Sequence, residues 1–270
     1  MEKQSTSDFD INFKKNSFLF FLFIVSINCK KTYPAYPSSN TAINGQLDWQ
    51  KKLYFDRIAE FQENPIGYDK IVFLGNSIIQ GGGDWNKKFK TNNIVNRGIS
   101  GDYTEGILAR LDEIIFYKPT SVFIMIGINE FFTDNSNNVQ ITPKYVANNI
   151  FKIAEKITSE SKKTTIFIFT ILPINNDQYI NVKNVNYNFL VKDFTPSVND
   201  QVQKTNLILK ANKKYKVIDL HSIFVGSTLE MNTDLSSDGV HLNENGYNLW
   251  VKNNFDLIKQ LEKITLFNSK

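Results

Sequence analysis

Five short apolar runs, separated by stretches of helical period, constrain the fold of this 270-residue chain more than any other feature. Most of their residues are β-branched or aromatic and do not alternate with polar residues, which is typical of strands buried on both faces of a parallel sheet. The runs cover 70–74, 93–95, 121–126, 165–171 and 215–220.

The stretches around these runs carry apolar residues at helical spacing. Helices are expected there, because the chain must cross over between successive parallel strands. They cover 48–62, 104–117, 143–158, 198–212 and 244–266. In the first of them the apolar face comprises Trp49, Leu53, Tyr54, Ile58 and Phe61. The sequence therefore predicts an α/β fold, a three-layer doubly wound sandwich around a five-stranded parallel sheet. The polar segments 133–138 and 175–196 lack a period and are expected to be surface loops, the second of them near the site.

The N-terminal segment has the pattern of a secretory signal. Two lysines precede the apolar run 18–25, which is shorter than the roughly 20 residues of a membrane span. Cys29 follows closely and resembles the lipidated cysteine of a bacterial lipoprotein, although Asn28 replaces the usual small residue. We expect a signal peptide over 1–28, a tether over 29–46 and a folded domain over 47–270. The protein is then secreted or held in a bacterial cell envelope, by lipidation of Cys29 or by a retained anchor.

Composition excludes several classes of function. The single cysteine permits neither an intrachain disulfide nor a zinc cluster. The net charge is +4 and the lysines are scattered, so no basic surface for nucleic acid is indicated. The glycine run 81–83 is followed by no Lys-Ser/Thr pair and lacks dinucleotide-binding spacing. We expect no metal, no cofactor, and no membrane contact beyond the N-terminal anchor.

Polar residues follow three of the expected strands. Ser77 ends the first, in Gly-Asn-Ser; Gly98 follows the second, in Asn-Arg-Gly-Ile-Ser-Gly-Asp; Asn129 follows the third, in Gly-Ile-Asn-Glu. Parallel strands end at one edge of the sheet, where open α/β folds bind ligands. A serine, a glycine N–H and an amide donor at that edge suit a nucleophile with an oxyanion site, although each residue alone also fits an ordinary cap or turn.

The most specific motif lies near the C-terminus, in Asp-Gly-Val-His-Leu. Asp238 and His241, three residues apart on one short loop, can act as a pair in which the carboxylate orients the imidazole. Imidazole has a reference pKa of about 6.5 and is therefore a usable base near neutrality. The only other histidine, His221, follows Asp219 by two residues at the end of the fifth strand. We interpret His221 as structural or pocket-lining.

In order and spacing these motifs resemble the SGNH (GDSL-like) hydrolases over roughly residues 68–255. The resemblance implies a flavodoxin-like fold and a serine esterase in which Ser77 is the nucleophile and His241 the base, oriented by Asp238. It also implies an oxyanion hole formed by the Ser77 and Gly98 N–H groups and the Asn129 amide. Asn76 stands where the family usually has aspartate, which puts high turnover rather than the reaction type in question. The surrounding residues look like those of platelet-activating-factor acetylhydrolase subunits and carbohydrate acetylesterases.

The resemblance favours hydrolysis of a short acyl ester, such as an acetylated sugar. A lysophospholipase or thioesterase is the alternative within the family. Outside it we retain a catalytically weakened glycan-binding protein, for which Asn76 is the argument, and a flavodoxin-like nucleotide or flavin binder, against which the missing phosphate loop counts.

Overall fold

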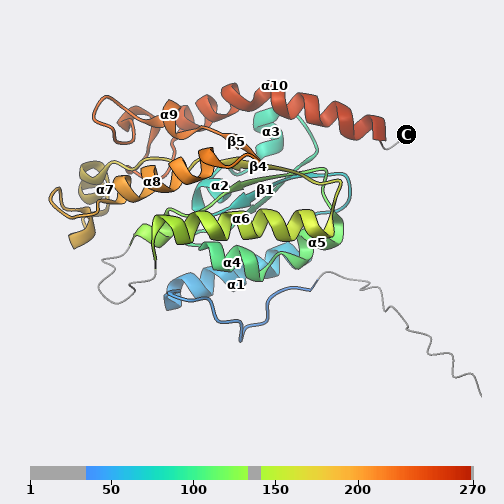
Figure 1. The fold of residues 1–270 in the computed structure, drawn as a ribbon, viewed down its shortest axis with the longest axis horizontal. Helices are drawn as coiled ribbons and strands as arrows, with labels where there is room; N and C mark the ends of the chain where they lie inside the picture. The colour runs from blue at the N-terminus through green and yellow to red at the C-terminus, as the bar shows by residue number, and fades with distance from the viewer. Residues whose placement is uncertain (1–34, 133–140, 269–270) are drawn as a thin grey trace, which may run out of the picture. The chain divides into compact units, whose positions relative to one another are not determined.

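The computed structural model describes residues 35–132 and 141–268, which contain a five-stranded parallel sheet with helices on both faces (Figure 1). The expected signal peptide, Cys29 and the polar segment 133–138 lie outside the described residues.

All five expected strands form, and their order confirms the doubly wound fold. The strands are β1 (Ile71–Gly75), β2 (Ile94–Gly98), β3 (Ser121–Met125), β4 (Thr165–Phe169) and β5 (Lys216–Ile218). They are arranged β2-β1-β3-β4-β5, so the strand order reverses between β1 and β3. Gly75 at the end of β1 pairs with Gly98 on one side and Met125 on the other, so the three strands end level with one another.

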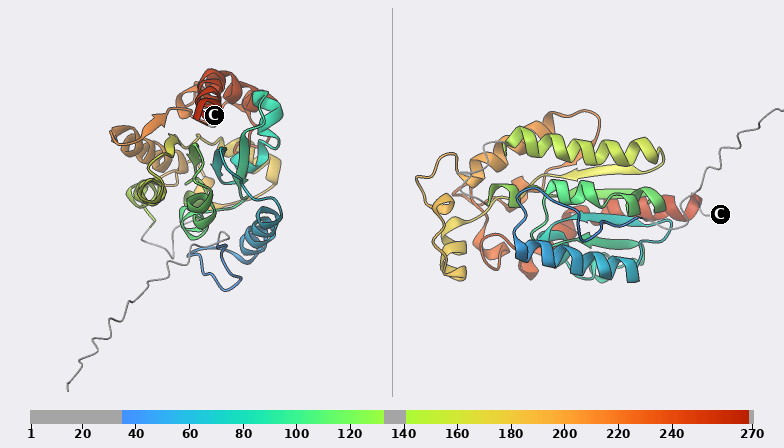
Figure 2. Two further views of the ribbon diagram at one scale, coloured as in Figure 1. Left: turned by 90° about the vertical axis from the view of Figure 1, so that its right-hand side faces the viewer. Right: turned by 90° about the horizontal axis from the view of Figure 1, so that it is seen from below.

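Each face of the sheet packs against its own set of helices (Figures 1 and 2). Leu74 and Ile124 belong to the core on the first face, and Phe73 and Phe123 to the core on the second. The first core includes residues of α4 (Thr104–Ala109), α5 (Asp112–Tyr117), α6 (Pro143–Glu160) and α8 (Val198–Ala211). The second includes residues of α2 (Ser77–Gly81), α3 (Trp85–Phe89), α9 (His221–Phe224) and α10 (Glu244–Asn268). Burial on both faces explains why the strands show no polar alternation.

Helix α1 (Asp48–Glu63) and the segment before it form a third, smaller core. Ile43 is buried there against Tyr54 and Ile58, and the Tyr36 hydroxyl donates to the Phe61 carbonyl at 3.3 Å. The described part of the expected tether is therefore packed onto the domain, which begins before residue 47.

The expected helix 104–117 is interrupted, because α4 ends at Ala109 and α5 begins at Asp112. Arg110 lies at the break with φ −114° and ψ 21°, and its guanidinium is buried rather than directed to solvent. Apolar spacing does not reveal such a break, since it depends on the polar partners of Arg110.

Segment 175–196 is not a simple loop. It contains α7 (Asn176–Lys183) and the 3₁₀ turn η2 (Asn188–Leu190). The Asn175 side chain caps α7 by accepting from the Gln178 N–H, but α7 has no fully buried side chain. Only Tyr179 and Ile180 of this helix pack partly buried against the core, and two neighbouring residues give no apolar period, which is why the sequence pattern missed it. The turns η1 (Asn129–Phe131) and η3 (Thr233–Leu235) complete the described elements.

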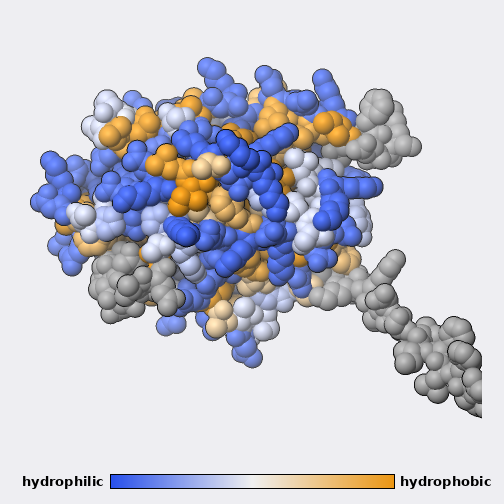
Figure 3. All heavy atoms as spheres, in the orientation of Figure 1, coloured by the Kyte–Doolittle hydropathy of each residue, from blue (hydrophilic) through white to orange (hydrophobic). Residues whose placement is uncertain are grey.

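The surface on the side of α6 and α8 carries mainly hydrophilic side chains, interrupted by small separate hydrophobic patches (Figure 3). Among the described residues, no helix has the length and apolar character needed to cross a membrane.

Candidate active site

A cleft of about 720 Å³ opens beside Ser77, Asn129 and His241. Ser77 follows β1 and Asn129 follows β3, so the cleft lies at the carboxyl edge of the sheet where the strand order reverses. Ligands bind at this position in open α/β folds. The other lining residues are Leu47, Trp49, Gln50, Ser100, Gly101, Tyr103, Phe132, Tyr179, Asn186, Tyr187, Asn188, Phe189 and Val240.

Ser77 is the first residue of α2, and Asn76 is its N-cap. The Asn76 side-chain oxygen accepts the Ile78 N–H at 3.0 Å, which is the capping bond that an aspartate would also make. The substitution of asparagine for aspartate therefore preserves how this turn is held. As the first residue of the helix, Ser77 has an N–H with no partner inside α2, and no other described group accepts it.

His241 joins the serine to the aspartate, as the sequence predicted. Its Nε2 lies 3.0 Å from Ser77 Oγ, and its Nδ1 lies 2.8 Å from Asp238 Oδ2. The second carboxylate oxygen accepts the backbone N–H groups of Val240 at 3.0 Å and His241 at 2.8 Å. Burial of Asp238 opposes its ionisation, but the hydrogen bonds from His241 and Lys183 outweigh burial and hold the pKa of Asp238 well below its usual range.

The loop that carries Asp238 and His241 is tightly closed. Ser236 Oγ accepts the Gly239 N–H at 2.7 Å and donates to the His241 carbonyl at 2.8 Å. Gly239 has φ +89°, and a Cβ there would lie 2.3 Å from the Asn175 carbonyl oxygen. Only glycine fits this position, so the turn sets the separation between the aspartate and the histidine.

Gly98 is not placed as the sequence predicted. Its N–H donates to Asn96 Oδ1 at 2.9 Å, and Gly98 does not line the cleft. Its lack of a side chain serves close packing instead, because a Cβ would lie 2.2 Å from the Gln80 backbone nitrogen.

The glycine that lines the cleft is Gly101, three residues further along. It has φ +75°, and its N–H donates to no acceptor among the described residues. Asn129, also in the cleft, donates one amide hydrogen to the Asp102 carbonyl at 2.9 Å, and the second has no acceptor among the described residues. Ser77, Gly101 and Asn129 therefore present three N–H donors to one cleft.

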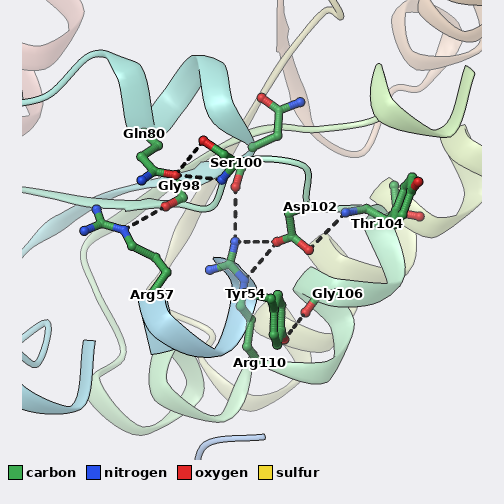
Figure 4. Close-up of polar contacts among 12 residues, drawn as sticks. Tyr54, Arg57, Gln80, Gly98, Ser100, Asp102, Thr104, Gly106 and Arg110 are labelled. Carbon is green, nitrogen blue, oxygen red and sulfur yellow. Dashed lines mark hydrogen bonds and ion pairs between the residues drawn. The ribbon is translucent and has the colours of Figure 1, made fainter. Parts of the chain in front are cut away.

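The turn carrying Gly101 rests on buried polar contacts (Figure 4). The guanidinium of Arg110 binds Asp102 Oδ2 at 2.9 Å and the Gly75 carbonyl at 3.2 Å, both from its Nη2. Burial raises the pKa of Asp102 to about 6, although Arg110 favours the charged form. Ser100 donates through N and Oγ to Gln80 Oε1, at 2.6 and 2.9 Å, which joins the turn to α2.

Glu130, next to Asn129, is 2% exposed. One of its carboxyl oxygens accepts the Thr104 N–H at 2.6 Å, and the other has no hydrogen-bond partner in the part of the chain that the structure describes. Burial raises the pKa of Glu130 to about 7 despite the hydrogen bonds from Thr104.

The second histidine stays outside the cleft. His221 begins α9, and no described group hydrogen-bonds to its ring. Asp219 is instead bound to Lys210 Nζ at 2.9 Å and to Thr170 Oγ1 at 3.1 Å. These positions agree with the structural interpretation of His221.

The sequence interpretation missed much of the cleft wall. Trp49, assigned to the apolar face of a helix, is 55% exposed at the cleft, and Tyr187 from segment 175–196 is 44% exposed. The tyrosine and asparagine content of that segment was the available signal. Lys183, whose Nζ lies 2.8 Å from Asp238 Oδ2, was missed as well. Within the described ranges, no three His, Cys, Asp or Glu side chains gather as metal ligands would.

Comparison with known proteins gives consistent results. Residues 73–249 match the GDSL-like lipase/acylhydrolase family. Platelet-activating factor acetylhydrolase IB subunit alpha2 of Rattus norvegicus is 26% identical over 197 residues, covering 71% of this chain and 76% of the relative. Two solved structures share the fold. A GDSL-like lipase from Bacteroides thetaiotaomicron is 24% identical, with TM-score 0.60 over 78% of this chain and 97% of that one. An acetyl xylan esterase is 17% identical, with TM-score 0.54 over 70% of this chain and 99% of that one.

Proposed function

Because the chain belongs to the GDSL-like lipase/acylhydrolase family of ester hydrolases, we propose that it cleaves a carboxylic ester through an acyl-enzyme on Ser77. The observation that carries this proposal is the placement of the His241 ring, 3.0 Å from Ser77 Oγ and 2.8 Å from Asp238 Oδ2. A nucleophile, a base and an orienting carboxylate in this relation are the parts of a serine hydrolase.

In the first half-reaction, His241 Nε2 takes the Ser77 hydroxyl proton while Oγ attacks the ester carbonyl. The tetrahedral intermediate collapses, the bond to the alcohol breaks, and His241 returns the proton to the leaving oxygen. In the second half-reaction, water gives its proton to His241 and attacks the acyl-enzyme. Collapse of this second intermediate releases the acid and returns the proton to Ser77. Asp238 stabilises the imidazolium in both halves.

The developing oxyanion is held by the N–H groups of Ser77 and Gly101 and by the free amide hydrogen of Asn129. Gly101 replaces Gly98 in this role, because the Gly98 N–H is already bonded to Asn96 Oδ1. Donors that are fixed before the reaction are worth about 2.7–4 kcal/mol each in comparable sites.

The substrate we propose is a short acyl ester, most simply an acetyl group, on a carbohydrate. The exposed rings of Trp49 and Tyr187 at the cleft offer flat apolar surfaces, and Asn186 and Asn188 lie beside Tyr187 with polar groups. This mixture suits a sugar ring better than a long acyl chain. A relative named for acetylhydrolase activity and a structural neighbour named acetyl xylan esterase support the acetyl group. A lysophospholipase or thioesterase activity is the alternative within the family.

The location we propose, secreted or lipid-anchored in the envelope, rests on the sequence of residues 1–29. Metabolic labelling with a fatty-acid analogue tests it in cells producing the protein and its Cys29→Ser variant. Label on the parent chain alone supports lipidation, and an unlabelled parent chain excludes it.

The experiment that tests the mechanism compares hydrolysis of p-nitrophenyl acetate and octanoate by the purified protein, Ser77→Ala and His241→Gln. Each variant should lose at least about 10³-fold in kcat, because the nucleophile or its base is gone. Near-full activity in either variant would overturn the assignment. A fluorophosphonate probe should label the parent protein on Ser77, whereas a glycan-binding protein with a weakened site would bind ligand without reacting. Preference for octanoate would remove the acetyl proposal and favour the lipase-like alternative.

A further inference from the structure

We propose that Lys183 acts on the triad through Asp238: by sharing the oxygen that binds the His241 ring, it extends activity toward lower pH. This inference rests on the proposed function, since it assigns Lys183 a role in the same reaction.

The contact is specific to one atom. Lys183 Nζ lies 2.8 Å from Asp238 Oδ2, the oxygen that also lies 2.8 Å from His241 Nδ1. The other oxygen, Oδ1, is occupied by two backbone N–H groups of the same loop. The carboxylate is 5% exposed, so the ammonium group supplies a countercharge that solvent does not.

Helix α7 brings the lysine to this position. Lys183 is its last residue, and Asn184 follows in the left-handed conformation with φ 51°. The other end of α7 is tied to the same catalytic loop, because the Asn175 N–H donates to the Gly239 carbonyl at 2.8 Å. Gln178 Nε2 also donates to the Ser236 carbonyl at 3.3 Å. A helix without a buried side chain is thus held on the loop by polar contacts at both ends.

The physical effect follows from charge rather than from orientation. Two backbone donors already orient the Asp238 carboxylate, so Lys183 adds little to its direction. The ammonium group instead neutralises part of the charge that would stabilise a protonated imidazole. Among the described residues, the other titratable groups that act on Asp238 are His241 and Tyr179, and neither carries a permanent positive charge. Without Lys183 the imidazolium form is stabilised more strongly, and His241 stays protonated, and inactive as a base, up to higher pH.

The chain contains a matched control. Lys210, in the last turn of α8, binds Asp219 Oδ2 at 2.9 Å. Its side chain is 44% exposed, against 42% for Lys183, and Asp219 also has a histidine close by in sequence. Neither Lys210 nor Asp219 lines the cleft.

The experiment measures kcat/KM for p-nitrophenyl acetate against pH, for the parent protein and for Lys183→Met, Lys183→Arg and Lys210→Met. The acid limb of this profile reports the base in the free enzyme. In Lys183→Met the acid limb should move to higher pH by about 0.5–1 unit, which is the size expected for a half-exposed ion pair. The plateau of kcat/KM above about pH 8 should stay within about twofold of the parent value. Lys183→Arg retains the cation and should keep the parent profile, as should Lys210→Met.

An unchanged acid limb in Lys183→Met overturns the inference, as does an equal movement in Lys210→Met. A rate lowered by one factor at every pH also overturns it, since lost structure rather than lost charge explains that result. Because the chain has only two histidines, NMR can follow the His241 ring directly, even in a variant with little activity. Its titration midpoint should rise in Lys183→Met and stay constant in Lys210→Met.

The same assay on Ser77→Ala separates the two proposals. If Ser77→Ala remains active, the proposed mechanism fails. If Ser77→Ala is inactive while Lys183→Met keeps the parent acid limb, only the role of Lys183 fails.

Discussion

The side-chain amide of Asn129 donates to the backbone carbonyl of Asp102 at 2.9 Å, which ties the end of β3 to the turn that follows β2. This bond fixes the direction of the amide, whose second hydrogen has no acceptor within the described ranges and lies beside the cleft. The proposed oxyanion donors at these two strand ends are therefore held relative to each other before substrate arrives.

Replacing Asn129 with alanine should lower kcat by about 10²–10³-fold and leave KM nearly unchanged, because the lost donor acts mainly on the transition state. Steady-state kinetics on p-nitrophenyl acetate measure both parameters. A raised KM with a normal kcat would show that Asn129 binds substrate instead.

Gly98 should not tolerate a side chain, for a reason of packing. A Cβ there would lie 2.2 Å from the Gln80 nitrogen and 2.8 Å from the Asn76 carbonyl oxygen, and backbone atoms cannot swing aside. Gly98→Ala should lose about 1–3 kcal/mol or more of unfolding free energy in urea. Gly226→Ala is the control, since its φ lies outside the left-handed region and no atom lies nearer than 3.5 Å to a Cβ there. Equal losses in the two variants would contradict the packing argument.

The pair Asp102–Arg110 should be needed for stability. Its side chains are 0% and 3% exposed, so Arg110→Met leaves a buried carboxylate without its countercharge. The expected loss is about 3–5 kcal/mol of unfolding free energy. Lys52→Met, which removes an exposed ion pair with Asp56, should leave stability close to that of the parent protein. A stable Arg110→Met variant would mean that Asp102 is neutral in the folded protein.

Glu130 should make stability depend on pH in the direction opposite to a salt-bridged carboxylate. Its pKa is raised to about 7 from 4.5, so between these values the folded chain holds a proton that the unfolded chain releases. Stability contributed by this group is complete below about pH 4.5 and is lost as pH rises through 7. The unfolding free energy of Glu130→Gln, measured relative to that of the parent protein, should therefore be about 1–3 kcal/mol higher at pH 8 than at pH 5. Urea unfolding of both proteins at both pH values measures this change. The same difference between variant and parent at pH 5 and pH 8 would contradict the role of Glu130.

The aromatic side chains at the cleft should matter for a sugar substrate only. Trp49→Ala and Tyr187→Ala should each raise KM several-fold for an acetylated xylo-oligosaccharide, because each removes a ring that can cover a sugar face. Neither variant should change KM for p-nitrophenyl acetate by more than about twofold, since that ester has no sugar ring for the two side chains to cover. Leu229→Ala, at an exposed position that does not line the cleft, is the control. Equal effects on both substrates would remove the support for a carbohydrate.

The sequence alone predicted the five strands, the doubly wound arrangement, and the residues Ser77, Asp238 and His241 that the structure brings together. These are local signals: a buried strand is a run of apolar residues, and an Asp-x-x-His turn places both side chains on one short loop. Helix α7 left no such signal, because none of its side chains is fully buried.

Only the tertiary structure decided which glycine N–H is free and which cation reaches Asp238. Gly98 and Gly101 look equivalent in the sequence, but the Asn96 side chain occupies one N–H and leaves the other open. Lys183 lies 55 residues from Asp238 in the chain (238 − 183), and no periodic pattern connects them. Hydrogen bonds and ion pairs between distant residues depend on how the elements pack, so they appear only when the chain is folded.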